Sequence, residues 1–235
     1  LEHISFRVER GQTLAIIGAT GSGKTTLAGL IPRFYDATQG TVLVDGVDVR
    51  DYTFDALYDR LGYVTQKAVL FSGTVQDNIF FGQSEAADTD ETLQQALQLS
   101  QAAEFVDRYP EKAAHPIAQL GRNVSGGQKQ RLSIARALAR RPEILIFDDS
   151  FSALDYKTDA TLREGLAKQL PGTTKIIVAQ RISTIRHADQ ILVLDRGEIA
   201  GLGTHDALMA SCPVYREIAM SQLSEEELKK GGASK

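Results

Sequence analysis

A glycine-rich stretch near the start of the chain carries residues whose types and spacing could bind phosphate. Residues 18–26 read GATGSGKTT and match the pattern G-x-x-x-x-G-K-[ST]. Glycines let such a loop curl so that successive backbone N–H groups point at the oxygens of a triphosphate. Lys24 would reach the β- and γ-phosphates, and the Thr25 hydroxyl would bind Mg²⁺. The residues predicted to hold the phosphates are Gly18, Thr20, Gly21, Ser22, Gly23, Lys24, Thr25 and Thr26.

The segments on either side of this loop predict the strand and the helix that would position it. Thr13–Ile17 is a short apolar run that is typical of a buried strand. Thr25–Ile31 predicts a helix whose N-terminus faces the phosphates. A simple glycine turn between a strand and a helix is the alternative, but the full motif in this setting favours phosphate binding.

Two further strand ends carry polar side chains that could join the same site. Ile144–Phe147 is a continuous apolar run, which indicates a buried parallel strand, and Asp148 follows it. A phosphate loop needs a carboxylate at a strand end to hold the Mg²⁺ shell, and Asp148 fits this role. Leu61–Thr65 predicts another strand that ends at Gln66, in the position where open α/β sheets contact their ligands.

A second anion site is predicted at the start of a helix. Ser125 is a favourable N-cap residue, and Gly126 and Gly127 would let an anion approach the exposed N–H groups closely. The basic residues of this helix could instead form a nucleic-acid surface, but a solvated helix surface with ion pairs explains them better. They are Lys129, Arg131, Arg136, Arg140 and Arg141.

The composition indicates an ordinary globular protein. The 235 residues are 43 % hydrophobic and 24 % charged, enough for one large domain or a core with a subdomain. The net charge of −4 gives no sign of binding to nucleic acid or to an anionic membrane. The single cysteine, Cys212, excludes an internal disulfide and suits a reducing compartment. No apolar run approaches the ~20 residues that are needed to span a bilayer. Because the sequence starts at Leu1 and not at a methionine, we expect it to be a piece of a longer chain.

The rest of the chain predicts strands and helices in alternation. Leu1–Val8 alternates apolar and polar residues like a half-buried strand, and Asp45-Gly46 within Thr41–Val49 is a strong hairpin signal. Asp88–Asp107 has apolar residues at helical spacing, which predicts a helical insertion. The other predicted elements are strands at Lys175–Ala179, Gln190–Leu194 and Glu198–Leu202, a helix at 155–170, helices from His205 onward and a frayed tail at Ser224–Lys235.

These motifs, taken in order, resemble those of one family. With its VSGGQ sequence the chain is similar to the nucleotide-binding domain of ABC transporters, and the resemblance runs nearly from end to end. The stretch FSGTVQDNI after Gln66 looks most like the exporter branch. The matching segments are the Walker A loop (Gly18–Thr26), the Q-loop (Gln66), the signature (Val124–Gln128), the Walker B strand (Ile144–Asp148), the D-loop (Ser152–Asp155) and the switch segment IIVAQRIST.

The resemblance implies an α/β fold. A P-loop NTPase (RecA-like) core with a mostly parallel sheet would carry an N-terminal antiparallel β-subdomain and an inserted α-helical subdomain. The domain would cover residues 1–223, with its core at 1–72 and 137–223 and its helical subdomain at about 73–136, followed by a flexible charged tail at 224–235.

The resemblance also implies partners and a shared site. In this family two nucleotide-binding domains associate head to tail with ATP and Mg²⁺ between them. The residues that would act across the interface are Ser125, Gly126, Gly127 and Gln128, on the partner's ATP, and Ser152 and Asp155 of the D-loop. The implied Mg²⁺ ligands are Thr25, Gln66 and Asp148. Transmembrane domains, fused upstream, would hold the chain at the cytoplasmic face of the cell membrane, and no nucleic-acid partner is expected.

Two residues depart from the family pattern at the chemistry. The residue after the Walker B aspartate is usually a glutamate that orients or deprotonates the attacking water, and here it is Asp149, one methylene shorter. The usual switch histidine is replaced by Gln180, whose amide can bond a phosphate but carries no imidazole charge. With Gln66, these are the candidate catalytic residues. They predict slow hydrolysis, as in the degenerate half of a heterodimeric multidrug exporter whose partner carries the glutamate and the histidine.

Three alternatives stay open at this point. The chain could belong to a homodimeric exporter in which Asp149 is an adequate base, to a soluble ABC ATPase acting on nucleic acid or ribosomes, or to a regulator that binds nucleotide without hydrolysis. The net charge and the exporter-like stretch argue against the soluble ATPase.

Overall fold

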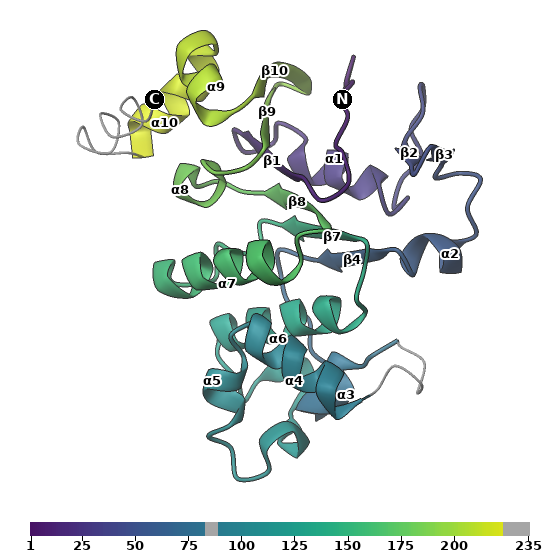
Figure 1. The fold of residues 1–235 in the computed structure, drawn as a ribbon, viewed down its shortest axis with the longest axis vertical. Coiled ribbons are helices and arrows are strands. Elements are labelled where there is room, and N and C mark those ends of the chain that lie inside the picture. The colour runs from purple at the N-terminus through teal and green to yellow at the C-terminus, as the bar shows by residue number, and fades with distance from the viewer. Residues whose placement is uncertain (83–88, 223–235) are drawn as a thin grey trace. The chain divides into compact units, whose positions relative to one another are not determined.

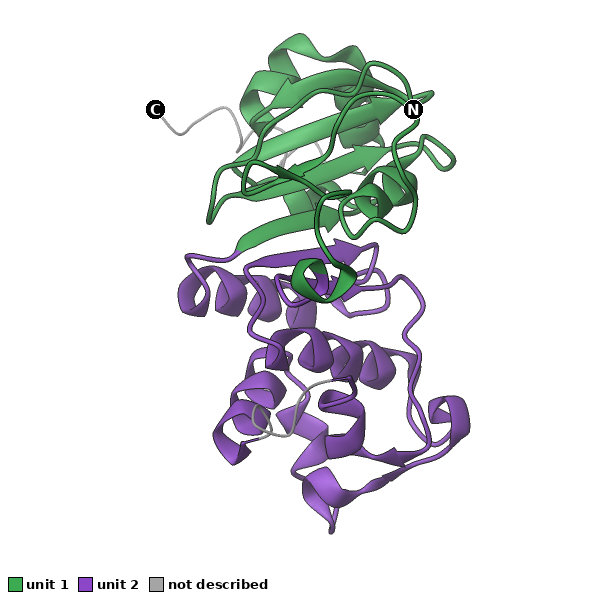
Figure 2. Cartoon of the chain, turned by 90° about the vertical axis from the view of Figure 1, so that its right-hand side faces the viewer, with its two compact units in different colours: residues 1–57, 174–235 green, residues 58–173 purple. Residues whose placement is uncertain are grey.

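The computed structural model describes residues 1–82 and 89–222 (Figure 1). Two compact units make up the chain (Figure 2). The first joins residues 1–57 to the C-terminal part of the chain from residue 174 on, and the second is formed by residues 58–173. The predicted tail at 224–235 lies outside the described residues.

The first unit contains a mostly parallel sheet, in which the described strands run in the order β10-β9-β1-β8. β1 (Thr13–Gly18) lies between β8 (Thr174–Val178) and β9 (Gln190–Asp195) and is parallel to both. β10 (Glu198–Gly203) closes the edge antiparallel to β9. The interior of β1 is fully buried, as expected for a continuous apolar run in a parallel sheet. The predicted α/β fold and these strands are confirmed.

Several of the described helices belong wholly or mainly to this unit. The C-terminal pair packs against β9 and β10 (Figure 1). The helices are α1 (Lys24–Leu30), α2 (Phe54–Tyr58, at the unit boundary), α8 (Ile182–Ile185), α9 (His205–Ser211) and α10 (Pro213–Gln222).

The N-terminal part of this unit is only partly as predicted. The hairpin is confirmed: β2 (Leu43–Val44) and β3 (Val47–Asp48) pair antiparallel around Asp45-Gly46, both with positive φ. The strand predicted at Leu1–Val8 is wrong. That segment forms no strand, and its Glu2 N–H donates to the Gly197 carbonyl at 2.9 Å. No strand among the described residues pairs with this segment, so its alternating pattern does not produce a β-strand. The N-terminal antiparallel structure of the described residues is the short hairpin of β2 and β3.

The second unit combines a two-stranded parallel pair with a group of helices. β4 (Leu61–Val64) pairs with β7 (Ile144–Asp148), and α7 (Tyr156–Gln169) follows them in the chain. The predicted helical insertion is confirmed between the two strands. Its elements are β5 (Gly73–Thr74), α3 (Val75–Ile79), α4 (Asp90–Leu99), α5 (Ala103–Val106), a 3₁₀ turn at Lys112–Ala114, β6 (Pro116–Ile117), a 3₁₀ turn at Gln119–Gly121 and α6 (Gly126–Ala139).

The arginines of α6 hold this helical group together. Arg131 pairs with Glu104 at 2.8 Å, which is the predicted kind of ion pair. Arg136 is not on a solvated surface: it donates to the Asn78 and Val69 carbonyls at 2.7 and 3.0 Å, and its guanidinium lies over the ring of Phe71. Arg131 and Arg136 therefore bond to neighbouring segments of this unit.

Among the described residues, no helix has the length and apolar character needed to cross a membrane.

A hydrogen-bonded pair anchors the C-terminal helices and predicts a pH effect on stability. His205 Nδ1 and the Tyr215 hydroxyl lie 2.7 Å apart, and Tyr215 is fully buried. Burial, as the largest cause, lowers the pKa of His205 from its ordinary value of 6.5. The unfolded chain therefore takes up the proton first, so this contribution to stability is present above about pH 6.5 and is lost as pH falls through the lowered pKa.

We expect the melting temperature of the wild type to fall more between about pH 7.5 and about pH 5.5 than that of His205→Gln, whose amide does not titrate. Thermal unfolding of both proteins across this range measures the difference. Two parallel curves would contradict the assignment.

Candidate functional site

The phosphate loop sits at the C-terminal end of β1 and depends on its glycines. Gly18 pairs with Leu194 of β9, and the Leu194 carbonyl occupies the space of any added Cβ. Gly21 and Gly23 adopt φ values of 80° and 101°, in the left-handed region that side chains disfavour. The glycines of the motif are therefore required by the backbone itself, and they produce the curled loop that the sequence predicts.

Two polar side chains in the loop are arranged for an anionic ligand. Lys24 Nζ donates to the carbonyls of Gly18 and Ala19 at 2.9 and 2.8 Å, which holds the ammonium across the loop. Ser22 is buried, and its Oγ has no hydrogen-bond partner among the described residues. Buried hydroxyls normally find a partner, so this atom is available to a ligand. Thr25 and Thr26 lie in the first turn of α1. The loop thus fits the phosphates of a nucleotide, with the Thr25 hydroxyl as a candidate Mg²⁺ ligand.

Gln180 lies at the same edge of the sheet as the phosphate loop. β8 pairs with β1 in parallel, with Val178 opposite Ile16, so both strands end at this edge. The Ala179 N–H extends the pairing by donating to the Ile16 carbonyl at 3.1 Å. Gln180 follows directly and is exposed. The structure therefore brings together two of the predicted features, the loop and the switch residue.

In the second unit, Gln66 and the two aspartates meet at the ends of β4 and β7. The register sets Val64 opposite Phe147, so the residues that follow the two strands are neighbours. Gln66 Nε2 donates to Asp149 Oδ2 at 2.9 Å. Gln66 and the end of the Walker B strand therefore lie at one edge of the β4–β7 pair. The Gln66 amide also fixes where the Asp149 carboxylate points.

Asp149 has an unusual backbone conformation. Its φ is 49°, in the left-handed region where aspartate is tolerated better than longer side chains. The Ser152 hydroxyl donates to the Asp149 carbonyl at 2.7 Å, which closes the turn after β7. Ser152 thus supports the position of Asp149 from the D-loop side.

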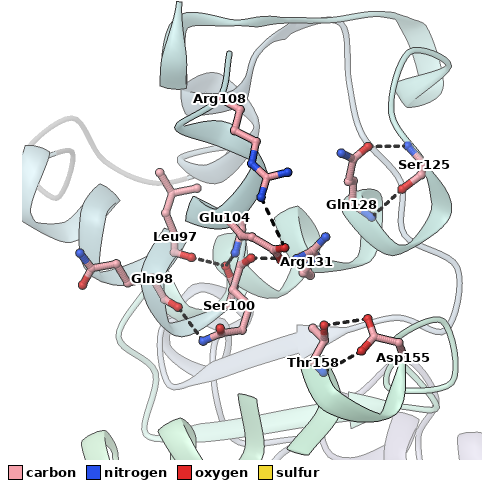
Figure 3. Close-up of polar contacts among 12 residues, drawn as sticks. Leu97, Gln98, Ser100, Glu104, Arg108, Ser125, Gln128, Arg131, Asp155 and Thr158 are labelled. Carbon is pink, nitrogen blue, oxygen red and sulfur yellow. Dashed lines mark hydrogen bonds and ion pairs between the residues drawn. The ribbon is translucent and has the colours of Figure 1, made fainter. Parts of the chain in front are cut away.

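The signature segment forms the N-terminus of α6 with a capping box (Figure 3). The Ser125 N–H donates to Gln128 Oε1 at 2.8 Å, and the Gln128 N–H donates to Ser125 Oγ at 3.3 Å. The N–H groups of Gly126 and Gly127 are then the ones that neither the box nor the helix uses. A Cβ on Gly127 would lie 3.4 Å from the Ala153 carbonyl, so this turn packs close to the D-loop.

Asp155 of the D-loop caps α7 (Figure 3). Its two carboxylate oxygens accept from the Thr158 N–H at 2.9 Å and from the Thr158 hydroxyl at 2.8 Å. The hydrogen bond from the Thr158 backbone, and then that from its hydroxyl, lower the pKa of Asp155, so the carboxylate is charged at neutral pH. These contacts lie within its own helix.

Sequence reasoning missed two side chains of this region. The Tyr63 hydroxyl donates to Asp148 Oδ2 at 3.1 Å from the middle of β4. Gln130 is buried in α6, and its Nε2 donates to the Thr65 carbonyl at 3.2 Å, one residue before Gln66. Gln130 could have been found, because it is a polar residue at a position of α6 where the helical pattern predicts an apolar one. The sequence pattern of β4 gives no indication that Tyr63 contacts Asp148.

Comparisons with known proteins agree with this picture. A family model described as ABC transporter matches residues 1–152. An uncharacterized ABC transporter ATP-binding protein of Mycobacterium bovis is 48 % identical over 223 residues, covering 94 % of this chain and 38 % of that protein. A putative multidrug export ATP-binding/permease protein of Bacillus subtilis is 44 % identical, covering 93 % and 37 %. An ATP-dependent lipid A-core flippase of Albidiferax ferrireducens is 42 % identical, covering 94 % and 38 %.

A solved structure gives the same result for the fold. A bacterial Atm1-family ABC exporter with ATP bound superposes with a TM-score of 0.90 at 38 % identity, over 94 % of this chain and 39 % of that chain. This chain spans less than two fifths of the length of these relatives. It belongs to the ABC transporter family and is homologous to the ATP-binding domains of ABC exporters.

Proposed function

We propose that this chain is the ATP-binding and ATP-hydrolysing domain of an ABC exporter. The observation that carries the proposal is the phosphate loop. In this loop Lys24 donates hydrogen bonds to two backbone carbonyls, and the buried Ser22 hydroxyl has no hydrogen-bond partner among the described residues. In the proposal, the loop residues and Asp148 have the roles in Mg-ATP binding that the motifs of the family imply. The relatives named as permease and flippase suggest a location at the cytoplasmic face of a membrane, with transmembrane domains in the same transporter.

Each residue then has a definite role. Lys24 binds the β- and γ-phosphates, and the loop N–H groups bind the remaining oxygens. Thr25, Gln66 and Asp148 would hold Mg²⁺, which would supply positive charge to neutralise the phosphates. Tyr63 orients Asp148 through its hydrogen bond. Gln66, bonded to Asp149, links the metal shell to the residue that would position the attacking water.

The site is proposed to hydrolyse slowly. Asp149 is shorter than glutamate, and the Gln66 amide holds its carboxylate. Gln180 can donate to the terminal phosphate but brings no positive charge. These features favour a degenerate site in a heterodimer, paired with a second nucleotide-binding domain that carries the glutamate and the histidine.

The signature segment is proposed to act on ATP bound by that partner. The unused N–H groups of Gly126 and Gly127 and the Ser125 hydroxyl form a donor-rich helix start of the kind that binds phosphate. Asp155 and Ser152 would lie at the same interface. In this arrangement the phosphate loop of one chain binds one ATP, and the signature segment of the same chain contacts the other ATP, which the partner's phosphate loop binds.

A complementation experiment tests the crossed site. Lys24→Met removes the phosphate lysine and keeps the signature, whereas Ser125→Arg blocks the signature and keeps the loop. We expect each variant alone to lack ATPase activity and an equimolar mixture to recover part of it, because a mixed dimer has one complete site. The rates are measured in the wild-type background and with Asp149→Glu plus Gln180→His, so that slow parental turnover does not hide the recovery.

Matched substitutions away from the site serve as controls. Lys168→Met removes an exposed lysine from α7, and Thr161→Arg replaces an exposed hydroxyl on the same helix. A mixture of these two variants should keep the parental rate throughout. Activity of Ser125→Arg alone at the parental rate would contradict a role of the signature in hydrolysis.

A further inference from the structure

The last residue of α10 bonds to the backbone of the switch segment. Gln222 Oε1 accepts from the Ile182 N–H at 2.9 Å, and Gln222 Nε2 donates to the Gln180 carbonyl at 2.7 Å. One primary amide offers both a donor and an acceptor, so it can pair with a chain segment as a neighbouring strand would. Gln222 therefore grips the backbone on both sides of Arg181.

Gln180 and Arg181 lie between two regular elements and belong to neither. β8 ends at Val178, and α8 begins at Ile182 with Arg181 at its N-cap position, where the Arg181 side chain makes no capping hydrogen bond. The Ile182 N–H is one of the donors that a helix start leaves unsatisfied. Gln222 supplies the missing cap from a helix end 40 residues further along the chain.

The position of Gln222 is fixed by the rest of α10. Tyr215 and Ala219 of this helix are fully buried, and Tyr215 bonds to His205 of α9 at 2.7 Å. Arg216 Nε also donates to the Met209 carbonyl of α9 at 2.9 Å. Because the helix is anchored along its length before Gln222, its last turn presents the amide at a defined place.

We propose that Gln222 is a positioning residue for the switch, through which α10 sets the reach of the Gln180 side chain toward the terminal phosphate. The backbone of Gln180 is held on its carbonyl side by Gln222, and the pairing of Ala179 with Ile16 holds the preceding residue against β1. Gln180 is therefore clamped between the sheet edge of the phosphate loop and the C-terminal helix. This inference rests on the proposed ATP function of the same site.

The test compares ATP with ADP, because only ATP carries the phosphate that Gln180 would contact. Gln222→Met keeps the length of the side chain and removes both hydrogen bonds. We expect it to weaken Mg-ATP binding by about threefold to tenfold, the effect of one or two net hydrogen bonds, and to leave Mg-ADP binding unchanged. Gln180→Ala should give a similar change, and the double variant should be no weaker than the stronger single variant. Fluorescent or calorimetric titration of the 235-residue chain measures the four affinities for each nucleotide.

Hydrogen exchange reports on the contact directly. In Gln222→Met the Ile182 amide should exchange faster than in the wild type. Gln169→Met, which replaces an exposed glutamine at the end of α7, is the control and should keep the wild-type exchange rates and nucleotide affinities. Equal loss of ATP and ADP affinity, additive effects of the two substitutions, or unchanged exchange at Ile182 would each overturn the positioning role. Failure of the wild type to bind Mg-ATP at all would overturn the proposed function, which separates the two outcomes.

Discussion

Replacing Lys24 with methionine is expected to lower the affinity for Mg-ATP about 10²-fold and to abolish ATP hydrolysis. A charge-assisted hydrogen bond from an ammonium to a phosphate contributes up to about 3 kcal/mol, which is about two powers of ten in affinity. Hydrolysis should suffer more, because charge develops on the transferred phosphoryl group and the lysine is among the residues that neutralise it. Titration with ATP and with a non-hydrolysable analogue, together with a phosphate-release assay, measures both effects.

The same substitution should leave the fold intact. The ammonium of Lys24 donates to the carbonyls of Gly18 and Ala19, and the bond to Ala19 is exposed to water. Because water can replace such a donor, we expect the free energy of unfolding to change by less than about 1 kcal/mol. Lys168→Met, which breaks the exposed ion pair with Glu164, is the matched control and should change neither stability nor affinity measurably. Wild-type affinity in Lys24→Met would remove the loop from the site.

Local sequence signals predicted most of the secondary structure that supports the site. The glycine pattern of residues 18–26 specifies its own loop, because Gly21 and Gly23 occupy conformations that other residues avoid. Ser125 with Gln128 three residues on specifies a capping box, and the structure contains it. Apolar runs specify buried strands such as β1 and β7. These features share a short range: each is decided by residues within one turn or one strand.

Contacts between distant segments could not be predicted in the same way. Tyr63 bonds to Asp148 across a separation of 85 residues, and Gln222 bonds to the switch segment across 40. Neither side chain stands in a local pattern, since a tyrosine in a strand and a glutamine at a helix end are ordinary there. The prediction of a strand at Leu1–Val8 failed for a related reason. Alternating apolar and polar residues suit a strand, but a strand also needs a neighbouring strand with which to pair. This segment has only scattered hydrogen bonds to other parts of the chain.

The double substitution Asp149→Glu with Gln180→His is expected to raise the ATP turnover of this chain's own site about 10²-fold. A carboxylate one methylene short is displaced by about 1–1.5 Å, and a misplacement of ~1 Å at the reacting group can cost ~10²-fold in rate. In the structure Gln66 holds the Asp149 carboxylate at 2.9 Å, so the short side chain cannot adjust freely toward a water on the phosphate. Histidine at position 180 would add a group that can carry charge beside the phosphate loop. The comparison is made in a dimer with an intact signature, by phosphate release at saturating Mg-ATP.

Stability separates a gain in chemistry from a gain in folding. Asp149 has a φ of 49°, and a longer side chain is less comfortable in this region, so Asp149→Glu should lower the free energy of unfolding by about 1 kcal/mol. A rate that rises while stability falls comes from the chemistry of the two substituted residues and not from a better-folded protein. Asp149→Asn keeps the shape without the charge, and it should lose whatever slow hydrolysis the wild type has while it still binds ATP. If the double variant turned over no faster than the wild type, the position of the carboxylate would not be what limits this site, and Asp149 would act as an adequate base.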